Sequence, residues 1–150
     1  MKIHGQAKLR ILVLGILTAG IMVVTGALGN AVAAKEMYKM APPPDPYKKV
    51  GSLVPLPDFI PGLGSLYVDP STLPAGPFLA YDRKGRLVSS VYMIPLKEIN
   101  DHKEFRNLKV AQEKVDHVDM YFNAGHPGVP EPHYHVILWY ISPEIQAGLK

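Results

Sequence analysis

Two stretches that read as β-strands most constrain the fold of this 150-residue chain. They lie within Val115–Ser142, with the sequence VDHVDMYFNAGHPGVPEPHYHVILWYIS. Successive side chains of a strand point to opposite faces, so the residues of each stretch sort onto two faces. The loop between the two stretches contains Pro127, Pro130 and Pro132, which stiffen it. We therefore expect two antiparallel strands joined by a rigid loop.

The two predicted strands place candidate metal ligands on one face of the sheet. His117 and Asp119 share a face of the first strand, and His133 and His135 share a face of the second. If Asp119 pairs with His133, then His117 falls opposite His135, and opposed Cβ atoms lie about 4.5–5.5 Å apart. His126, in the loop, is a candidate fifth ligand. Imidazole and carboxylate groups suit Zn, Cu, Fe or Mn, so the sequence predicts a site for a divalent transition metal.

The alternative is that these side chains form an ordinary polar sheet face that holds no metal. Four of the six histidines of the chain fall in this one unit, which favours the metal site. If the site is catalytic, an open coordination position would activate water or a substrate, and Glu131 is the candidate general base. The residues name no substrate.

The absence of cysteine excludes disulfides, thiolate catalysis and Cys-ligated zinc. The chain also contains no G-x-S-x-G motif and no glycine-rich phosphate loop before a helix. A nucleophile-based enzyme therefore finds no support, and whether the protein is an enzyme stays open.

The N-terminus has the pattern of an export signal. Lys2, Lys8 and Arg10 precede an apolar run over residues 11–28, and Ala31-Val32-Ala33 forms an A-x-A cleavage signal. We therefore predict a signal peptide over residues 1–33, cleaved after Ala33, and an exported protein, periplasmic or extracellular. The alternative is that residues 11–28 are retained as a membrane anchor, since the run is at the lower limit of a spanning helix.

Removal of this signal changes the electrostatic balance. Residues 1–33 hold three of the 16 basic residues and none of the 13 acidic ones, so the remaining chain carries 13 of each. Such a neutral chain has no basic footprint for nucleic acid, and we expect no nucleic-acid partner. A small exported domain without disulfides is often stabilised by a metal or by oligomerisation, so a homo-oligomer is also expected.

The rest of the chain divides at a proline-rich segment. Residues 34–49 are polar and contain Pro42-Pro43-Pro44, which predicts an extended spacer. Residues 50–150 form the predicted single β-rich domain. It begins with an irregular but apolar wrap over residues 50–77, where proline and glycine leave room only for short strands.

The remaining elements complete a small antiparallel sheet. Pro77–Pro95 is predicted to be a hairpin that turns at Arg83-Lys84-Gly85. Short helices are expected over residues 96–106 and from Ser142, where Pro143 suits a first turn. The predicted fold class is mostly β, a small α+β domain. It consists of an antiparallel sheet of hairpins with one or two short helices and a Pro/Gly-rich wrap.

Three segments carry a resemblance to a known family. They are PDFIPGLGSLYVDP (57–70), GPFLAYDRKGRLVSSVYMIP (76–95) and HVDMYFNAGHPGVPEPHYHVILWYIS (117–142). Over about residues 55–142 the chain resembles a family of small, uncharacterised exported prokaryotic proteins, a domain of unknown function with a Thermus representative of known structure. The resemblance implies the fold and export, and it supplies no activity.

Two hypotheses of function follow. The first is an exported domain that binds a divalent transition metal through the His/Asp cluster, with its activity unassigned. The second is a non-enzymatic structural protein that forms oligomers or docks to a partner without metal.

Overall fold

The computed structural model describes residues 37–111 and 113–150. The predicted signal peptide over residues 1–33, with its cleavage after Ala33, lies outside the described residues. Within the described residues, no helix is both long and apolar enough to cross a membrane.

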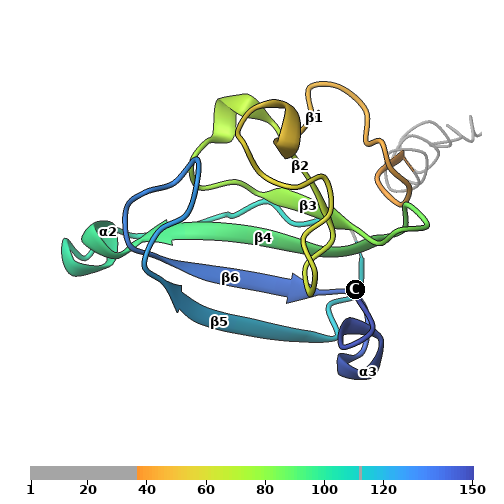
Figure 1. Ribbon diagram of the computed structural model, residues 1–150. Coiled ribbons are helices and arrows are strands. Elements are labelled where there is room, and N and C mark those ends of the chain that lie inside the picture. The colour runs from red at the N-terminus through yellow and green to blue at the C-terminus, as the bar shows by residue number, and fades with distance from the viewer. Residues whose placement is uncertain (1–36, 112) are drawn as a thin grey trace, which may run out of the picture.

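Six strands of the described chain form one antiparallel sheet in the order β1-β2-β3-β4-β6-β5 (Figure 1). The strands are β1 Lys48–Lys49, β2 Ser65–Val68, β3 Phe78–Tyr81, β4 Leu87–Pro95, β5 His117–Asn123 and β6 His133–Trp139. The helices are α2 Leu96–Asn100 and α3 Pro143–Gln146, with the short 3₁₀ helices η1 Val50–Ser52 and η2 Pro70–Thr72. The predicted fold class is confirmed.

The β3–β4 hairpin forms where the turn residues predicted it. Gly85 has a φ of 76°, and its N–H donates to the carbonyl of Asp82 at 2.9 Å. The Asp82 carboxylate also accepts from the backbone N–H groups of Lys84 and Arg86 at 2.8 and 2.9 Å. These bonds satisfy backbone donors that the tight turn would leave unpaired.

One face of the sheet packs under the apolar wrap, which was predicted to be irregular. Leu63 and Leu66 are buried at 8% exposure, and they join Phe78 and Val91 in the main hydrophobic core. β4 lies in the middle of the sheet, and its residues from Leu87 to Ile94 are all buried. The wrap and the β5–β6 loop cover the same face of the sheet in Figure 1.

The other face of the sheet carries a cluster of tyrosines. Tyr38 and Tyr47, from the segment predicted as a spacer, pack against the buried Leu79 and Tyr81. The Tyr81 hydroxyl donates to the Tyr38 carbonyl at 2.9 Å. This part of residues 34–49 thus lies on the sheet, to which β1 also adds two residues.

Strands β5 and β6 pair antiparallel, as expected, but in a different register. Asn123 lies opposite His133 and Tyr121 opposite His135, so β5 is displaced by four residues from the pairing considered above. Because four is an even number, every side chain keeps its face while its cross-strand partner changes. The histidine face of β6 is turned toward the core, where His133 is fully buried and His135 is 7% exposed.

Candidate metal centre

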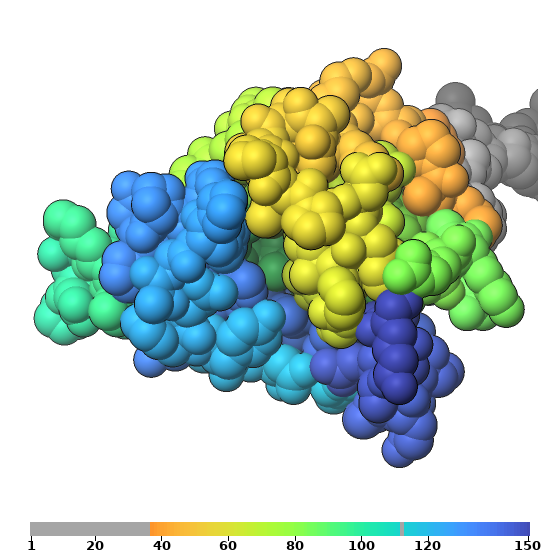
Figure 2. Space-filling view, in the orientation of Figure 1, coloured from red at the N-terminus to blue at the C-terminus, as the bar shows by residue number. Residues whose placement is uncertain are grey.

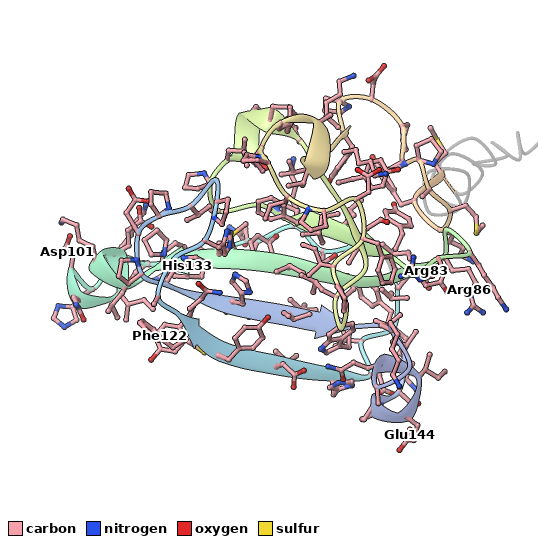
Figure 3. The ribbon with its side chains drawn as sticks, in the orientation of Figure 1. Arg83, Arg86, Asp101, Phe122, His133 and Glu144 are labelled. Atoms are coloured by element: carbon pink, nitrogen blue, oxygen red, sulfur yellow. The ribbon has the colours of Figure 1, made fainter. Side chains whose placement is uncertain are left out.

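Three histidines converge under the β5–β6 loop. His133 and His135 come from β6, His126 comes from the loop, and one ring nitrogen from each lies within 4.8 Å of the other two. The ring centroids of His133 and His135 are 4.9 Å apart, and that of His126 lies 5.0 and 5.6 Å from them. Figure 3 shows His133 between β6 and the loop. Three nitrogen ligands on one tetrahedral zinc ion lie roughly 3.3 Å apart, so small side-chain rotations bring these rings to ligand positions.

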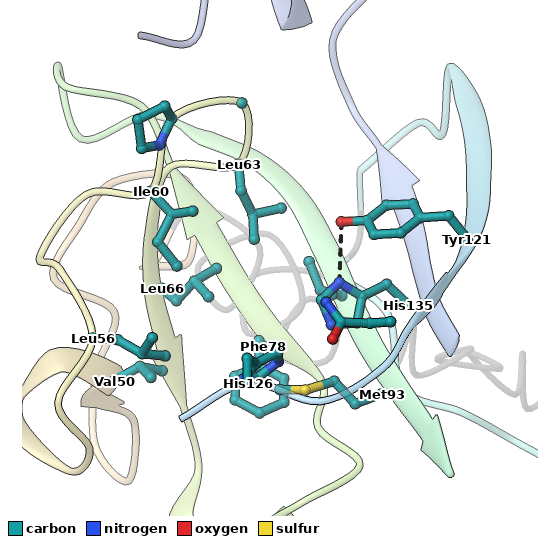
Figure 4. A pocket seen from close by; sticks show the side chains of 14 residues that line it. Val50, Leu56, Ile60, Leu63, Leu66, Phe78, Met93, Tyr121, His126 and His135 are labelled. Carbon is teal, nitrogen blue, oxygen red and sulfur yellow. Dashed lines mark hydrogen bonds between the residues drawn. The ribbon is translucent and has the colours of Figure 1, made fainter. Parts of the chain in front are cut away.

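Each of the three rings has an oxygen partner at its Nδ1 atom. The Nδ1 of His133 donates to the Glu131 carbonyl at 2.7 Å, and that of His126 donates to the Pro127 carbonyl at 3.0 Å. The Nδ1 of His135 lies 3.0 Å from the Tyr121 hydroxyl (Figure 4). A carbonyl can only accept, so two of the three tautomers are fixed with the Nε2 lone pair free. Histidines that bind metal ions in proteins have their other ring nitrogen held in this way.

Two of these Nε2 atoms face each other directly. The Nε2 atoms of His133 and His135 are 2.9 Å apart in a buried position. Two bare lone pairs at this distance repel, so either a proton or a cation must lie between them. Without a metal, His135 donates its Nε2 proton to His133 and accepts from the Tyr121 hydroxyl at Nδ1. If the Nε2 of His135 held a metal, its proton would lie on Nδ1 and the Tyr121 hydroxyl would accept it.

Burial sets the charge state of His135. Desolvation, followed by repulsion from the neighbouring rings of His133 and His126, lowers the pKa of His135 to about 4. The ring is therefore neutral at physiological pH and keeps a lone pair for a ligand bond.

The loop positions His126 through a tight turn of its own. His126 and Val129 exchange two backbone hydrogen bonds of 3.0 Å across Pro127 and Gly128. Proline at the first central position and glycine with a φ of 90° at the second are typical of a type II turn. Val129 is 6% exposed and joins the hydrophobic core, which ties the turn to the sheet.

Gly125 precedes this turn and cannot be replaced without movement. Its φ is +123°, and a Cβ atom built there would lie 2.3 Å from the Pro130 carbonyl oxygen. The close approach of the two ends of the loop thus requires glycine beside His126.

The other two predicted ligands lie farther along β5, away from this cluster. His117 pairs with Trp139 and Asp119 with Ile137. The Asp119 carboxylate accepts from the Trp139 indole at 2.7 Å and from the Gln146 amide at 3.1 Å. The structure therefore places Asp119 in a network that connects β5, β6 and α3.

His117 belongs to the same network. Its Nε2 donates to the Gln146 side-chain carbonyl at 3.0 Å, and its Nδ1 lies 3.0 Å from the Asp116 carboxylate. The hydrogen bond with Asp116 raises the pKa of His117. A raised pKa favours the protonated ring, which has no lone pair for a metal.

Glu131, the candidate general base, contributes to the cluster through its backbone. Its side chain is exposed and is absent from the residues lining the neighbouring pocket, whereas its carbonyl accepts from His133. Its role as a base stays a prediction. The sequence patterns did not single out Tyr121 or Asn123, yet Tyr121 lies opposite His135, Asn123 lies opposite His133, and both line that pocket. The available signal was the alternation itself, which continues from His117 and Asp119 to these two residues on the same face.

The fold and the cluster together define a small antiparallel β domain with a group of three histidines, two buried and one half-buried, that can hold a metal ion. The chain matches no protein-family model and no curated protein. Among solved structures it is similar to the crystal structure of the hypothetical protein TTHB210 from Thermus thermophilus. The two share 49% sequence identity with a TM-score of 0.57, over 63% of this chain and 92% of the Thermus chain.

This protein therefore belongs to the family of that Thermus protein, which confirms the predicted resemblance to an uncharacterised family with a Thermus representative. The Thermus protein is described only as hypothetical, so the likeness assigns no function. It also leaves export untested.

Proposed function

We propose that this protein binds one divalent transition metal ion through His126, His133 and His135. The observation that carries the proposal is the orientation of the rings. Each Nδ1 contacts an oxygen atom, and the Nε2 atoms of His133 and His135 face each other at 2.9 Å. A cation held by both atoms would replace the Nε2–H···Nε2 hydrogen bond by two metal–nitrogen bonds, while each Nδ1 keeps its oxygen partner.

The donor set is compatible with several metals. Three imidazoles suit Zn, Cu, Fe or Mn, and affinity among these follows the general order of divalent ions. Three protein ligands leave a fourth position of a tetrahedral ion open, as in catalytic zinc sites. His126 and His135 also line an apolar pocket, so a small molecule in that pocket would lie beside a metal held by the histidines. A metal-dependent reaction on such a molecule is the activity that this arrangement favours.

Elemental analysis tests the proposal. The chain is produced from its own Met1 without a histidine tag and is analysed beside a His133→Ala/His135→Ala variant. His117→Ala is the matched control, since it removes a histidine that lies outside the cluster. We expect one metal per chain in the wild type and in the control, and none in the double variant.

A second variant guards against loss of folding. His133 and His135 are buried, whereas His126 is only half-buried in a loop, so His126→Ala should keep the fold. Circular dichroism establishes that it does. Full metal content in folded His126→Ala and in the double variant would overturn the proposal, as would a wild-type chain that takes up no zinc, copper, iron or manganese.

Self-assembly is the second candidate function, and strand β5 favours it. β5 is the last strand of the sheet, and no other strand of the described residues pairs with its outer edge. Its outward face carries Val118, Met120 and Phe122, which are 55%, 59% and 51% exposed. We propose that a second copy of the chain pairs with this edge in an antiparallel β5–β5 arrangement about a two-fold axis, which would set Val118, Met120 and Phe122 of the two copies side by side.

Light scattering tests this arrangement. A dimer in the wild type that becomes a monomer in Met120→Lys would support it, because a lysine on each copy would meet its partner across the axis. Leu108→Lys is the control, as Leu108 is an exposed apolar residue outside β5. A monomeric wild type would refute the pairing. Export also stays part of the proposed function, with residues 1–33 as the signal.

A further inference from the structure

An apolar cavity of about 310 Å³ lies directly beside the histidine cluster. Its walls come from the wrap on one side and from the central strands on the other. In Figure 2 a hollow opens between the yellow segment of the wrap and the light-blue β5–β6 loop. Figure 4 shows Ile60, Leu63 and Leu66 across the cavity from Tyr121 and His135.

Most of the cavity wall is hydrocarbon. Ile60, Leu63, Leu66, Phe78 and Met93 are among the lining residues, and no lysine, arginine, aspartate or glutamate of the described chain is. At the roughly 30 Å³ that a water molecule occupies in the liquid, this space holds about ten non-hydrogen atoms. The volume is at the lower end of the range for small-molecule sites. The body of the ligand is therefore small and apolar.

All of the polar side chains that line the cavity are neighbours. They are Tyr121, Asn123, His126 and His135. The Asn123 side-chain carbonyl already accepts from the Gly125 N–H at 2.8 Å, which leaves the Asn123 amide as a donor. When His135 donates to the Tyr121 hydroxyl, the hydroxyl proton is also free to be donated. A cation held by the histidines adds positive charge at the same end.

This end of the cavity therefore attracts an acceptor, and preferably an anion. A carboxylate in an apolar cavity is costly unless a positive charge and hydrogen-bond donors replace its water. The metal ion and the two donors supply both. An ammonium group would meet donors and a cation instead, and an alcohol would bring no charge.

We propose that the cavity binds a small carboxylic acid with an apolar body of about ten non-hydrogen atoms in total, whose carboxylate contacts Tyr121, Asn123 and the bound metal. The inference rests on the proposed metal site for its charged end. The apolar part of the site stands on the cavity alone.

Three probes with eight carbon atoms each and different polar ends test the assignment. Octanoate, octan-1-ol and octylamine are titrated by calorimetry into the full chain, once zinc-loaded and dialysed and once metal-free. We expect octanoate to bind the zinc-loaded chain at least tenfold more tightly than octan-1-ol, and octylamine more weakly than either. Octanoate should bind the metal-free chain at least tenfold more weakly than the zinc-loaded one, since only the donors remain.

The Leu63→Trp variant tests whether the probe binds in the cavity. Leu63 lies in a turn of the wrap and lines the cavity, so an indole there fills the space without altering a strand. The variant should lose octanoate binding while it retains zinc and a wild-type circular dichroism spectrum. Undiminished octanoate binding by this variant would place the ligand elsewhere and overturn the inference.

Failure of this inference and failure of the metal site are distinguishable. Zinc uptake without any octanoate binding would overturn the cavity assignment and leave the metal site intact. Octanoate binding by a chain that takes up no metal, lost in Leu63→Trp, would support the cavity and refute the metal site. Equal affinity for all three probes would refute the carboxylate.

Discussion

Replacement of Gly125 by alanine should test how the loop holds His126. The φ of +123° lies outside the regions that residues with a Cβ adopt, and such strain costs about 1–3 kcal/mol. The new Cβ would also lie 2.3 Å from the Pro130 carbonyl oxygen, below the 3.0 Å that Cβ atoms normally keep. One side of the loop must therefore shift by about 0.7 Å or more.

We expect Gly125→Ala to lower the free energy of unfolding by about 2–3 kcal/mol, after allowance for the reduced entropy of the unfolded chain. Because the shift starts next to His126, zinc affinity should fall about 10–100-fold, as when the supports of a metal ligand are altered. Urea unfolding measures the first quantity, and competition with a chromophoric chelator measures the second.

Gly62→Ala is the matched control for this variant. Gly62 also has a positive φ, of 78°, but nothing lies within 4 Å of the position of its Cβ. Gly62→Ala should lower the free energy of unfolding by about 1 kcal/mol or less and leave the zinc affinity unchanged. The same stability and the same zinc affinity in the two variants would refute the argument that contact between the loop ends positions His126.

Three further predictions concern separate parts of the molecule. As pH falls from about 6.5 to 4, His135 takes up a proton in the unfolded chain, whereas the same ring stays neutral in the folded chain. The metal-free chain should therefore lose up to about 3 kcal/mol of stability relative to His135→Gln, and parallel urea-unfolding curves across pH would contradict this. Asp119→Ala should lower the free energy of unfolding by about 2 kcal/mol and alter tryptophan fluorescence, because it leaves the buried Trp139 indole N–H without its acceptor. Zinc binding should be unchanged, and loss of zinc would show that Asp119 is a ligand. The mass of the protein recovered from its producing cells should correspond to a chain beginning at Ala34, whereas a full-length mass in the membrane fraction would indicate a retained anchor.

Local patterns predicted the elements of the fold because their causes are local. The turn at Arg83-Lys84-Gly85 depends on a glycine with positive φ and on one aspartate side chain three residues before it. The alternation in β5 and β6 follows from the pleat of a strand and sorted every side chain to its observed face. Face assignments survive a register shift by an even number of residues, so they were robust.

The pairing register could not be obtained in the same way. With a nine-residue loop, several even registers leave every side chain on the same face, and the alternation does not choose among them. The observed register depends on the turn from His126 to Val129, on the insertion of Val129 into the core and on the contact of Gly125 with Pro130. These are contacts between the loop and the body of the domain.

The sequence by itself determined the type of fold, the common face of the histidines and the donor types available, because each follows from local geometry or from composition. The tertiary structure decided which histidines meet. His126 lies with His133 and His135. Asp119 instead accepts a hydrogen bond from the Trp139 indole, and His117 forms one with Gln146. The cluster also lies beside an apolar cavity, which no local sequence pattern predicts. Contacts between residues far apart in the chain are set by packing of the whole domain, and so only the folded molecule could show where the site lies.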